Sequence, residues 1–171
     1  SRTQSTNQNK NNTKKTSLYE DAIVKALKTT NNKNNLLPLK KVNRLGHLPL
    51  GDASSSSFQS QLARYQKVTT LTEITPSNAL EKTRNLDTLI ISFHRSNENP
   101  WKASNLNREE VGIISALAKT KTVILDLFVK PYALNGIEKV QGIDGLLLSY
   151  QNSVIAQQLS VDAIFGAQEI T

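Results

Sequence analysis

The sequence contains no cysteine and no methionine among its 171 residues. The missing cysteine excludes disulfide-stabilised scaffolds, thiolate metal sites and cysteine nucleophiles, and it leaves the redox compartment undetermined. No run of eighteen apolar residues occurs, so no segment is expected to span a membrane. The absence of methionine, even at position 1, predicts a processed or excised piece, for which a missing signal peptide says little about location.

Apolar residues are also few, at 37% of the chain, and the deficit is concentrated in the first third. Residues 1–16, "SRTQSTNQNKNNTKKT", hold no apolar side chain whose burial could offset the entropy of ordering. The total length suits one domain with a real core. We therefore predict a polar, basic linker or tail at 1–16 and one globular domain at 17–171.

Negative charge is scarce only at the N-terminal end. Residues 1–44 hold ten Lys or Arg against Glu20 and Asp21, whereas residues 45–171 hold eleven basic and twelve acidic side chains. The net charge of +7 therefore belongs to the tail and its surroundings, and the folded part is nearly neutral. A solvated linker and an arm that binds phosphate or anionic lipid both fit this tail. Because no aromatic residue precedes Tyr19, base stacking is not available there, so we favour the linker and expect no nucleic-acid partner.

Apolar runs and amphipathic stretches alternate along the rest of the chain. A helix is predicted from Ser17 to about Thr29, followed by an extended segment at 35–40 that contains Pro38. Five strand–helix alternations follow, and these are typical of a parallel sheet covered on both faces. We expect a three-layer α/β/α sandwich with a mostly parallel, five- to six-stranded, flavodoxin-like sheet. The predicted strands are 44–51, 67–74, 87–94, 121–129 and 143–150, and the predicted helices are 54–66, a helix from Pro76, 107–119, 131–136 and 152–166.

Polar, titratable and aromatic residues follow directly after the third predicted strand, in the stretch "DTLIISFHRSNENPW". In open α/β sheets, ligands bind beyond the carboxyl ends of the strands. We therefore expect the loops at 51–54, 94–101, 129–132 and 150–152 to gather at one edge and to form a cleft or a docking surface. The candidate ligand-binding side chains at this edge are Asp52, His94, Arg95 and Trp101.

Each of these candidates also has a purely structural interpretation. His94 could act as a general base, but no carboxylate partner is evident in the sequence, so a packed or hydrogen-bonded histidine is favoured. His47 alternates with leucines inside a strand, and a core position suits it better still. Trp101 fits stacking on a sugar ring and anchoring of a loop equally well. Asp126 lies within a strand, and we expect it to face the core with hydrogen-bonding partners.

Other chemistries find little support in the sequence. No His, Asp or Glu cluster has the spacing of a metal site, and no cofactor is expected. The run Ser54–Ser57 lacks the glycine spacing of a phosphate-binding loop, so helix capping explains it better. A free-standing flavodoxin-like binding or signalling module remains the alternative class. A phosphoacceptor module would need an acidic pair after the first strand, where the chain offers only Asp52.

Three passages resemble the C-terminal domain of glycoside hydrolase family 3. They are "AIVKALKTTNNKNNLLPLK", "LNREEVGIISALAKTKTVILDLFVKPYAL" and "LLLSYQNSVIAQQLSVDAIFGAQEIT", and together they span about residues 17–171. The segments "LPLGD" and "FHRSNENPWK" are most similar to bacterial β-N-acetylglucosaminidase-like members of that family. The resemblance implies that this C-terminal domain lines or supports the active site of a TIM-barrel domain, which carries the nucleophilic aspartate.

The resemblance implies a retaining β-N-acetylglucosaminidase or β-glucosidase that acts on terminal non-reducing β-linked sugars, with the barrel as partner domain and a carbohydrate as substrate. The present chain alone would be inactive. In β-glucosidase members a glutamate after this strand serves as acid/base, and Glu98 lies in the matching stretch. In the N-acetylglucosaminidase branch the acid/base resembles a His–Asp pair on the barrel, which would leave Glu98 as a solvated or ligand-lining residue. The family makes a periplasmic or secreted location plausible, whereas the residues themselves leave the compartment open.

Overall fold

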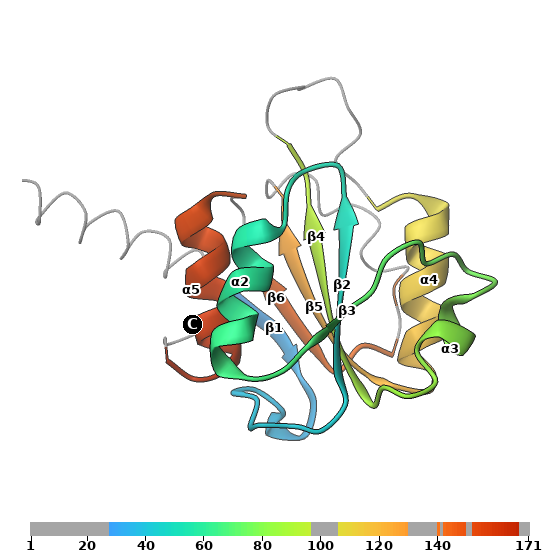
Figure 1. Ribbon diagram of the computed structural model, residues 1–171, viewed down its shortest axis with the longest axis horizontal. Coiled ribbons are helices and arrows are strands. Elements are labelled where there is room, and N and C mark those ends of the chain that lie inside the picture. Colours follow the sequence, from blue (N-terminus) through green and yellow to red (C-terminus); the bar gives the residue numbers. More distant parts are fainter. Residues whose placement is uncertain (1–27, 97–105, 130–139, 141, 150–151, 168–171) are drawn as a thin grey trace, which may run out of the picture.

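The computed structural model describes residues 28–96, 106–129, 140, 142–149 and 152–167. Within these residues, one six-stranded sheet lies between two layers of helices (Figure 1). The strand at one edge is antiparallel to its neighbour, and the other five strands are parallel to one another. The expected three-layer sandwich with a mostly parallel sheet is confirmed. In spatial order the strands are β1 (Lys28–Asn32), β6 (Gly145–Leu148), β5 (Thr122–Phe128), β4 (Thr88–His94), β2 (Leu45–Gly51) and β3 (Thr69–Thr70).

The five parallel strands have the order of a flavodoxin-like sheet. The chain passes from β2 outward to β3, and then returns to the other side of β2 to form β4, β5 and β6 in succession. The direction of winding therefore reverses between β2 and β4. In sheets of this kind, the crevice beyond the carboxyl ends of those two strands is where ligands bind.

Two pairs of helices cover the two faces of the sheet (Figure 1). On one face α2 (Ser56–Tyr65) packs beside α5 (Val154–Ile164), and on the other face α3 (Ala79–Lys82) packs beside α4 (Arg108–Ala118). A short 3-10 helix, η1 (Lys33–Asn35), follows β1. Each face encloses its own apolar core, because the central strands have side chains that are buried in both directions. All seven residues of β4 are buried.

Local sequence signals account for the helix starts. Asn107 accepts a hydrogen bond from the backbone N–H of Glu110, and the Glu110 carboxylate accepts one from the backbone N–H of Asn107. This reciprocal capping box begins α4 at the predicted position. Ser153 caps α5 in a similar way, because its hydroxyl oxygen accepts from the backbone N–H of Ala156.

Three predicted elements differ from the structure: the end of the first helix, the strand at 67–74 and the helix from Pro76. Lys28 and Thr29, predicted to end a helix, lie in β1, because pairing with the leucine-rich β6 and the β-branched threonines favour a strand. The strand predicted at 67–74 is only Thr69–Thr70, because it pairs on one side alone and Glu73 turns the chain with φ of 55°. Residues 17–27 and the helix predicted at 131–136 lie outside the described residues.

The helix predicted from Pro76 is a single turn that begins later, at Ala79. The side chain of Asn78 holds the preceding turn, since its Oδ1 accepts from the backbone N–H of Thr75 and its Nδ2 donates to the carbonyl of Glu73. Asparagine that bonds to nearby backbone in this way competes with the helix. The Thr83 hydroxyl donates to the carbonyl of Ala79 at the end of the turn.

Across the described stretches, no helix combines the length and apolar character needed to cross a lipid bilayer.

Candidate functional site

The carboxyl ends of β2 and β4 are held together by a close backbone approach. Gly51 has φ of 97°, and a Cβ atom at this position would lie 2.0 Å from the carbonyl oxygen of His94. The same carbonyl accepts a hydrogen bond of 3.2 Å from the backbone N–H of Ala53. The turn after β2 therefore lies directly against the end of β4. This contact brings Asp52 beside Arg95.

Arg95 is the centre of a charged cluster at this edge. Its Nη1 lies 3.7 Å from Oδ1 of Asp52, and its Nη2 lies 3.4 Å from Oε1 of Glu110. The guanidinium carbon lies 4.7 Å from the centre of the Phe93 ring, a cation–π contact. The backbone N–H of Ser96 also donates to Asp52 Oδ1, at 3.2 Å. Two carboxylates from separate elements thus orient one guanidinium.

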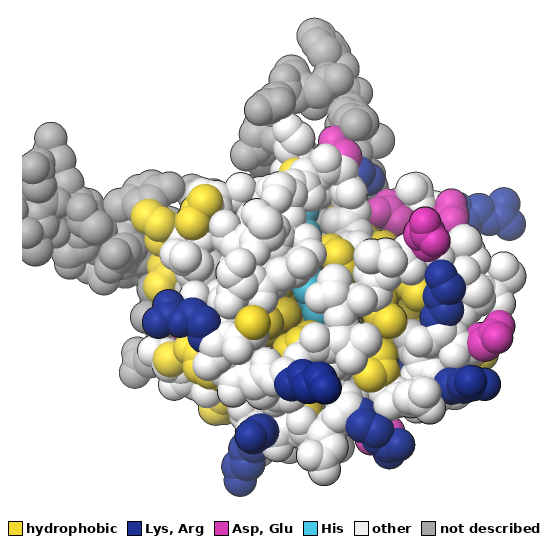
Figure 2. Space-filling view, viewed as in Figure 1, with side chains coloured by type: hydrophobic (Ala, Val, Ile, Leu, Met, Phe, Trp, Pro, Cys, Tyr) yellow, Lys and Arg dark blue, Asp and Glu magenta, His cyan; other side chains and the backbone are white. Residues whose placement is uncertain are grey.

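The cluster is shielded from solvent but not sealed. The side chains of Arg95, Asp52 and Glu110 are 15%, 21% and 10% exposed. Figure 2 shows acidic side chains gathered toward the upper right of the face, near the start of α4. A guanidinium that offers donors next to carboxylates that offer acceptors can bind a ligand rich in hydroxyl groups.

A row of hydrogen-bonded polar side chains, all buried except the half-buried Asn152, runs beneath this edge. Oδ1 of Asn152 can only accept, so the 2.7 Å contact from Nδ1 of His94 places a proton on Nδ1. Nε2 of a neutral His94 then accepts from the hydroxyl of Ser92, at 2.7 Å. That hydroxyl oxygen in turn accepts from Nε2 of His47, also at 2.7 Å. Gln157 completes the row, because its Nε2 donates to Asn152 at 2.9 Å.

Burial keeps both histidines neutral. Burial, and secondarily the charge of His94, lowers the pKa of His47 to about 3. Burial also lowers the pKa of His94 to about 4, although the hydrogen bond to Asn152 raises it in part. Both rings lie against apolar neighbours: His47 packs on Phe58 with ring centroids 5.0 Å apart, and His94 stacks on Phe128 at 4.8 Å.

Asp126 is a second buried polar group on the same face of the sheet. The hydroxyls of Ser149 and Ser160 both donate to its carboxylate, the former at 2.7 Å. The expectation of a hydrogen-bonded core aspartate agrees with these contacts. Burial raises the pKa of Asp126 to about 7, against the opposing effect of both serine hydrogen bonds. The carboxyl group therefore holds a proton below neutral pH in the folded chain, although it is ionised above about pH 4 when unfolded.

We expect the substitution Asp126→Asn to gain relative stability as the pH rises. Between about pH 4 and pH 7 the folded aspartate binds more protons than the unfolded one, so the free energy of unfolding falls with increasing pH. Asparagine removes this dependence. From pH 5 to pH 8, the difference in unfolding free energy between the variant and the unsubstituted chain should shift in favour of the variant by about 3 kcal/mol. Urea unfolding at both pH values measures it, and a constant difference would contradict the raised pKa.

The predicted site residues are distributed unevenly. Asp52 and Arg95 come together as an ion pair, and contacts of Asp52 with Ser96 and of His94 with Asn152 join three of the four predicted loops. His94 is fully buried, so it does not face solvent at this edge. Glu98 and Trp101 lie outside the described residues. The sequence reading missed Glu110 as a partner of Arg95, although the Asn-x-x-Glu capping box placed it at the start of α4.

Within the described residues, no group of three or more His, Asp or Glu side chains is arranged to hold a metal ion. Of the described acidic residues, Asp52 and Glu110 both pair with Arg95.

No protein-family model and no curated protein matches the sequence. Solved structures match the fold. A structure described as a fungal multi-domain GH3 β-N-acetylglucosaminidase superposes with a TM-score of 0.66 and 19% identity, covering 90% of this chain and 18% of that chain. This chain shares its fold with a region of family 3 glycoside hydrolases. The β-glucosidase from Listeria innocua gives a TM-score of 0.67 at 18% identity, covering 87% of this chain and 24% of the enzyme.

A β-glucoside phosphorylase bound to 2FGlc also matches, with a TM-score of 0.63 and 13% identity over 88% of this chain. The matched region is 29% of that phosphorylase. The chain thus spans less than a third of each of these three glycoside-acting proteins. The matched fold occurs in each of them as one part of a much larger protein.

Proposed function

We propose that this chain is the C-terminal α/β sandwich domain of a family 3 glycoside hydrolase, a retaining β-N-acetylglucosaminidase or β-glucosidase that acts on terminal non-reducing β-linked sugars. Its carboxyl edge lines or supports the active site of a TIM-barrel domain. The observation that carries the proposal is the fold match over 86–90% of the chain to regions of much longer glycoside-acting proteins.

The chemistry of the edge suits a supporting role. Retaining glycosidases need two carboxyl groups about 5 Å apart, one as nucleophile and one as acid/base. Here Asp52 and Glu110 both pair with Arg95 and orient its guanidinium. Such a cluster can hold sugar hydroxyls, while the nucleophile is supplied by the barrel.

Glu98, His94 and Trp101 complete the proposed site. Glu98 serves as the acid/base only if the protein follows the β-glucosidase branch. Otherwise it lines the ligand. Trp101 would stack on a sugar ring or on the barrel surface. His94 supports the edge from below, because its hydrogen bonds to Ser92 and Asn152 connect the end of β4 to the loop before α5.

The test compares the isolated chain with a longer protein that includes the barrel. The isolated chain should not turn over a chromogenic N-acetylglucosaminide or glucoside, whereas the longer protein should. In the longer protein, Arg95→Gln should lower kcat/KM about tenfold, because an ordered binding group is worth about 1.4 kcal/mol or more. Arg44→Gln is the matched control, since Arg44 also pairs with an aspartate, Asp87, at 2.8 Å but lies at the start of β2.

Two results would overturn the proposal. Substantial turnover by the pure isolated chain would refute the division of labour between the domains. Equal effects of Arg95→Gln and Arg44→Gln on kcat/KM would show that the carboxyl edge has no special relation to the substrate.

A free-standing flavodoxin-like binding or signalling module is the second candidate, and the strand order favours it as well. The residue Asp52, directly after β2, distinguishes this chain from a phosphoacceptor signalling module. Asp52 is paired with Arg95, rather than standing in an acidic pair, so it does not resemble a phosphoacceptor. Titration of the isolated chain with flavin mononucleotide and with acetyl phosphate separates this alternative, because the glycosidase-domain proposal expects no response to either.

A further inference from the structure

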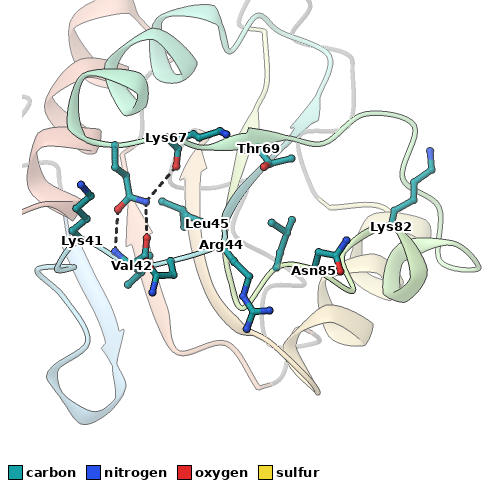
Figure 3. A pocket seen from close by; sticks show the side chains of 11 residues that line it. Lys41, Val42, Arg44, Leu45, Lys67, Thr69, Lys82 and Asn85 are labelled. Carbon is teal, nitrogen blue, oxygen red and sulfur yellow. Dashed lines mark hydrogen bonds between the residues drawn. The ribbon is translucent and has the colours of Figure 1, made fainter.

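A second site lies at the opposite edge of the sheet from the Arg95 cluster. A pocket of about 600 Å³ opens beside the amino-terminal ends of β2 and β3 (Figure 3). Its walls come from the segment before β2, from the loop between α2 and β3, and from the chain that leads from α3 to β4. The lining side chains are Lys41, Val42, Asn43, Arg44, Leu45, Gln66, Lys67, Thr69, Lys82, Asn85 and Leu86.

Among the described residues, the pocket is lined by cations and by no carboxylate. Lys41, Arg44, Lys67 and Lys82 all belong to its wall, and all four side chains are exposed. Arg44 alone among them has an ion-pair partner within the described stretches, Asp87, which stands outside the lining. Cations that gather around a concavity raise the local potential and attract anions. Figure 2 shows dark blue side chains spread along the lower part of this face, where acidic ones are few.

Hydrogen bonds hold the walls of this pocket in place. The Gln66 side chain holds the segment before β2 in place. Its Oε1 accepts from the backbone N–H of Val42 at 3.1 Å, and its Nε2 donates to the carbonyl of Val42 at 2.9 Å (Figure 3). Arg44 adopts φ of 56°, an uncommon conformation for an arginine, and its carbonyl accepts from the backbone N–H of Asp87. Lys82 donates to the carbonyl of Glu73 at 3.2 Å. The walls are therefore ordered, with Arg44 and Lys82 held by these contacts, and Lys41 and Lys67 supply the remaining cations.

We propose that this pocket binds an acidic oligosaccharide, a sugar chain that carries sulfate, phosphate or carboxylate groups. Lysine ammonium groups bind such anions as point charges without demanding one geometry. Asn43, Thr69 and Asn85 add neutral hydrogen-bonding groups that suit sugar hydroxyls. No aromatic side chain is among the described residues that line the pocket, so they offer no stacking platform of the kind that single-stranded nucleic acids depend on.

This inference does not rest on the proposed glycosidase role. The pocket and the Arg95 cluster lie at opposite ends of the parallel strands. An anionic ligand in the pocket would therefore anchor the protein and would not be a substrate bound at the Arg95 cluster. Such an anchor raises the local concentration of the Arg95 cluster near a matrix that contains the acidic oligosaccharide.

The test is calorimetric titration of the full chain with three probes: a heparin-derived tetrasaccharide, a neutral chito-oligosaccharide of the same length, and a dT12 oligonucleotide. We expect salt-dependent binding of the sulfated sugar and none of the neutral sugar. The double variant Lys41→Gln, Lys67→Gln should weaken binding of the sulfated sugar at least about tenfold and lower the salt slope by about two. Arg108→Gln, an exposed cation at the start of α4, is the control and should leave both values unchanged.

Thermal unfolding of each variant establishes that the fold is retained. Removal of exposed lysines that take part in no described ion pair should leave the unfolding temperature unchanged. The proposal is overturned if the pocket double variant and Arg108→Gln behave alike, if the neutral sugar binds equally well, or if dT12 binds more tightly and is lost through the same lysines.

Discussion

Replacing Gly51 with alanine is expected to lower the free energy of unfolding by about 4 kcal/mol. The added Cβ would lie 2.0 Å from the carbonyl oxygen of His94 and 2.8 Å from its carbonyl carbon, and both atoms are backbone, so no side chain can move aside. Either the end of β2 must separate from β4, or φ must leave its value of 97°. Each outcome also separates Asp52 from Arg95.

Gly142→Ala is the matched control for this prediction. Gly142 also has a positive φ, 83°, so alanine pays a similar conformational cost there, but its nearest contact is a side-chain atom of Ala118 at 3.4 Å. We expect a loss of about 1 kcal/mol at Gly142. Chemical unfolding of the two variants side by side isolates the effect of the close backbone approach. Equal losses would mean that β2 and β4 do not depend on this contact at their carboxyl ends.

The central strands were predictable because a strand that is buried on both faces has a nearly continuous run of apolar residues. The run at 88–94 is apolar enough to identify β4, and the capping residues Asn107 and Glu110 fix the start of α4. The edge strands were less predictable. At Lys28 and Thr29, pairing with β6 overrides a local helical pattern, and this pairing joins residues more than a hundred positions apart.

The candidate site was predictable in place but not in detail. Parallel strands of a doubly wound sheet bring their carboxyl ends together, so the sequence could place Asp52 and Arg95 at one edge. The sequence favoured a packed or hydrogen-bonded His94 over a general base, but it could not identify Ser92 and Asn152 as the partners. The links from His47 through Ser92 to His94 depend on register between β2 and β4, which only the structure supplies.

The same buried histidines predict that the protein is sensitive to acid. In the unfolded chain a histidine binds a proton below about pH 6.5. In the folded chain the pKa of His94 is lowered to about 4 and that of His47 to about 3, so the unfolded state binds more protons throughout this window. The free energy of unfolding therefore falls as the pH drops below 6.5. Together the two histidines remove on the order of 7 kcal/mol by pH 4, a large part of a typical domain stability.

Asp126 opposes this acid-induced loss of stability, so replacing Asp126 and replacing His94 should change the pH profile in opposite directions. Because its pKa is raised to about 7, its protonation stabilises the fold as the pH drops from 7 to 4, by on the order of 4 kcal/mol. The unsubstituted chain should therefore lose only about 3 kcal/mol between pH 6.5 and pH 4. His94→Gln should make that part of the profile nearly flat, and Asp126→Asn should make it about twice as steep. Urea unfolding at half-unit pH steps measures all three profiles, and Leu80→Ala, at a half-exposed apolar position, should run parallel to the unsubstituted chain. If His94→Gln kept the full slope, the row of hydrogen-bonded polar side chains would not be the acid-sensitive element of the fold.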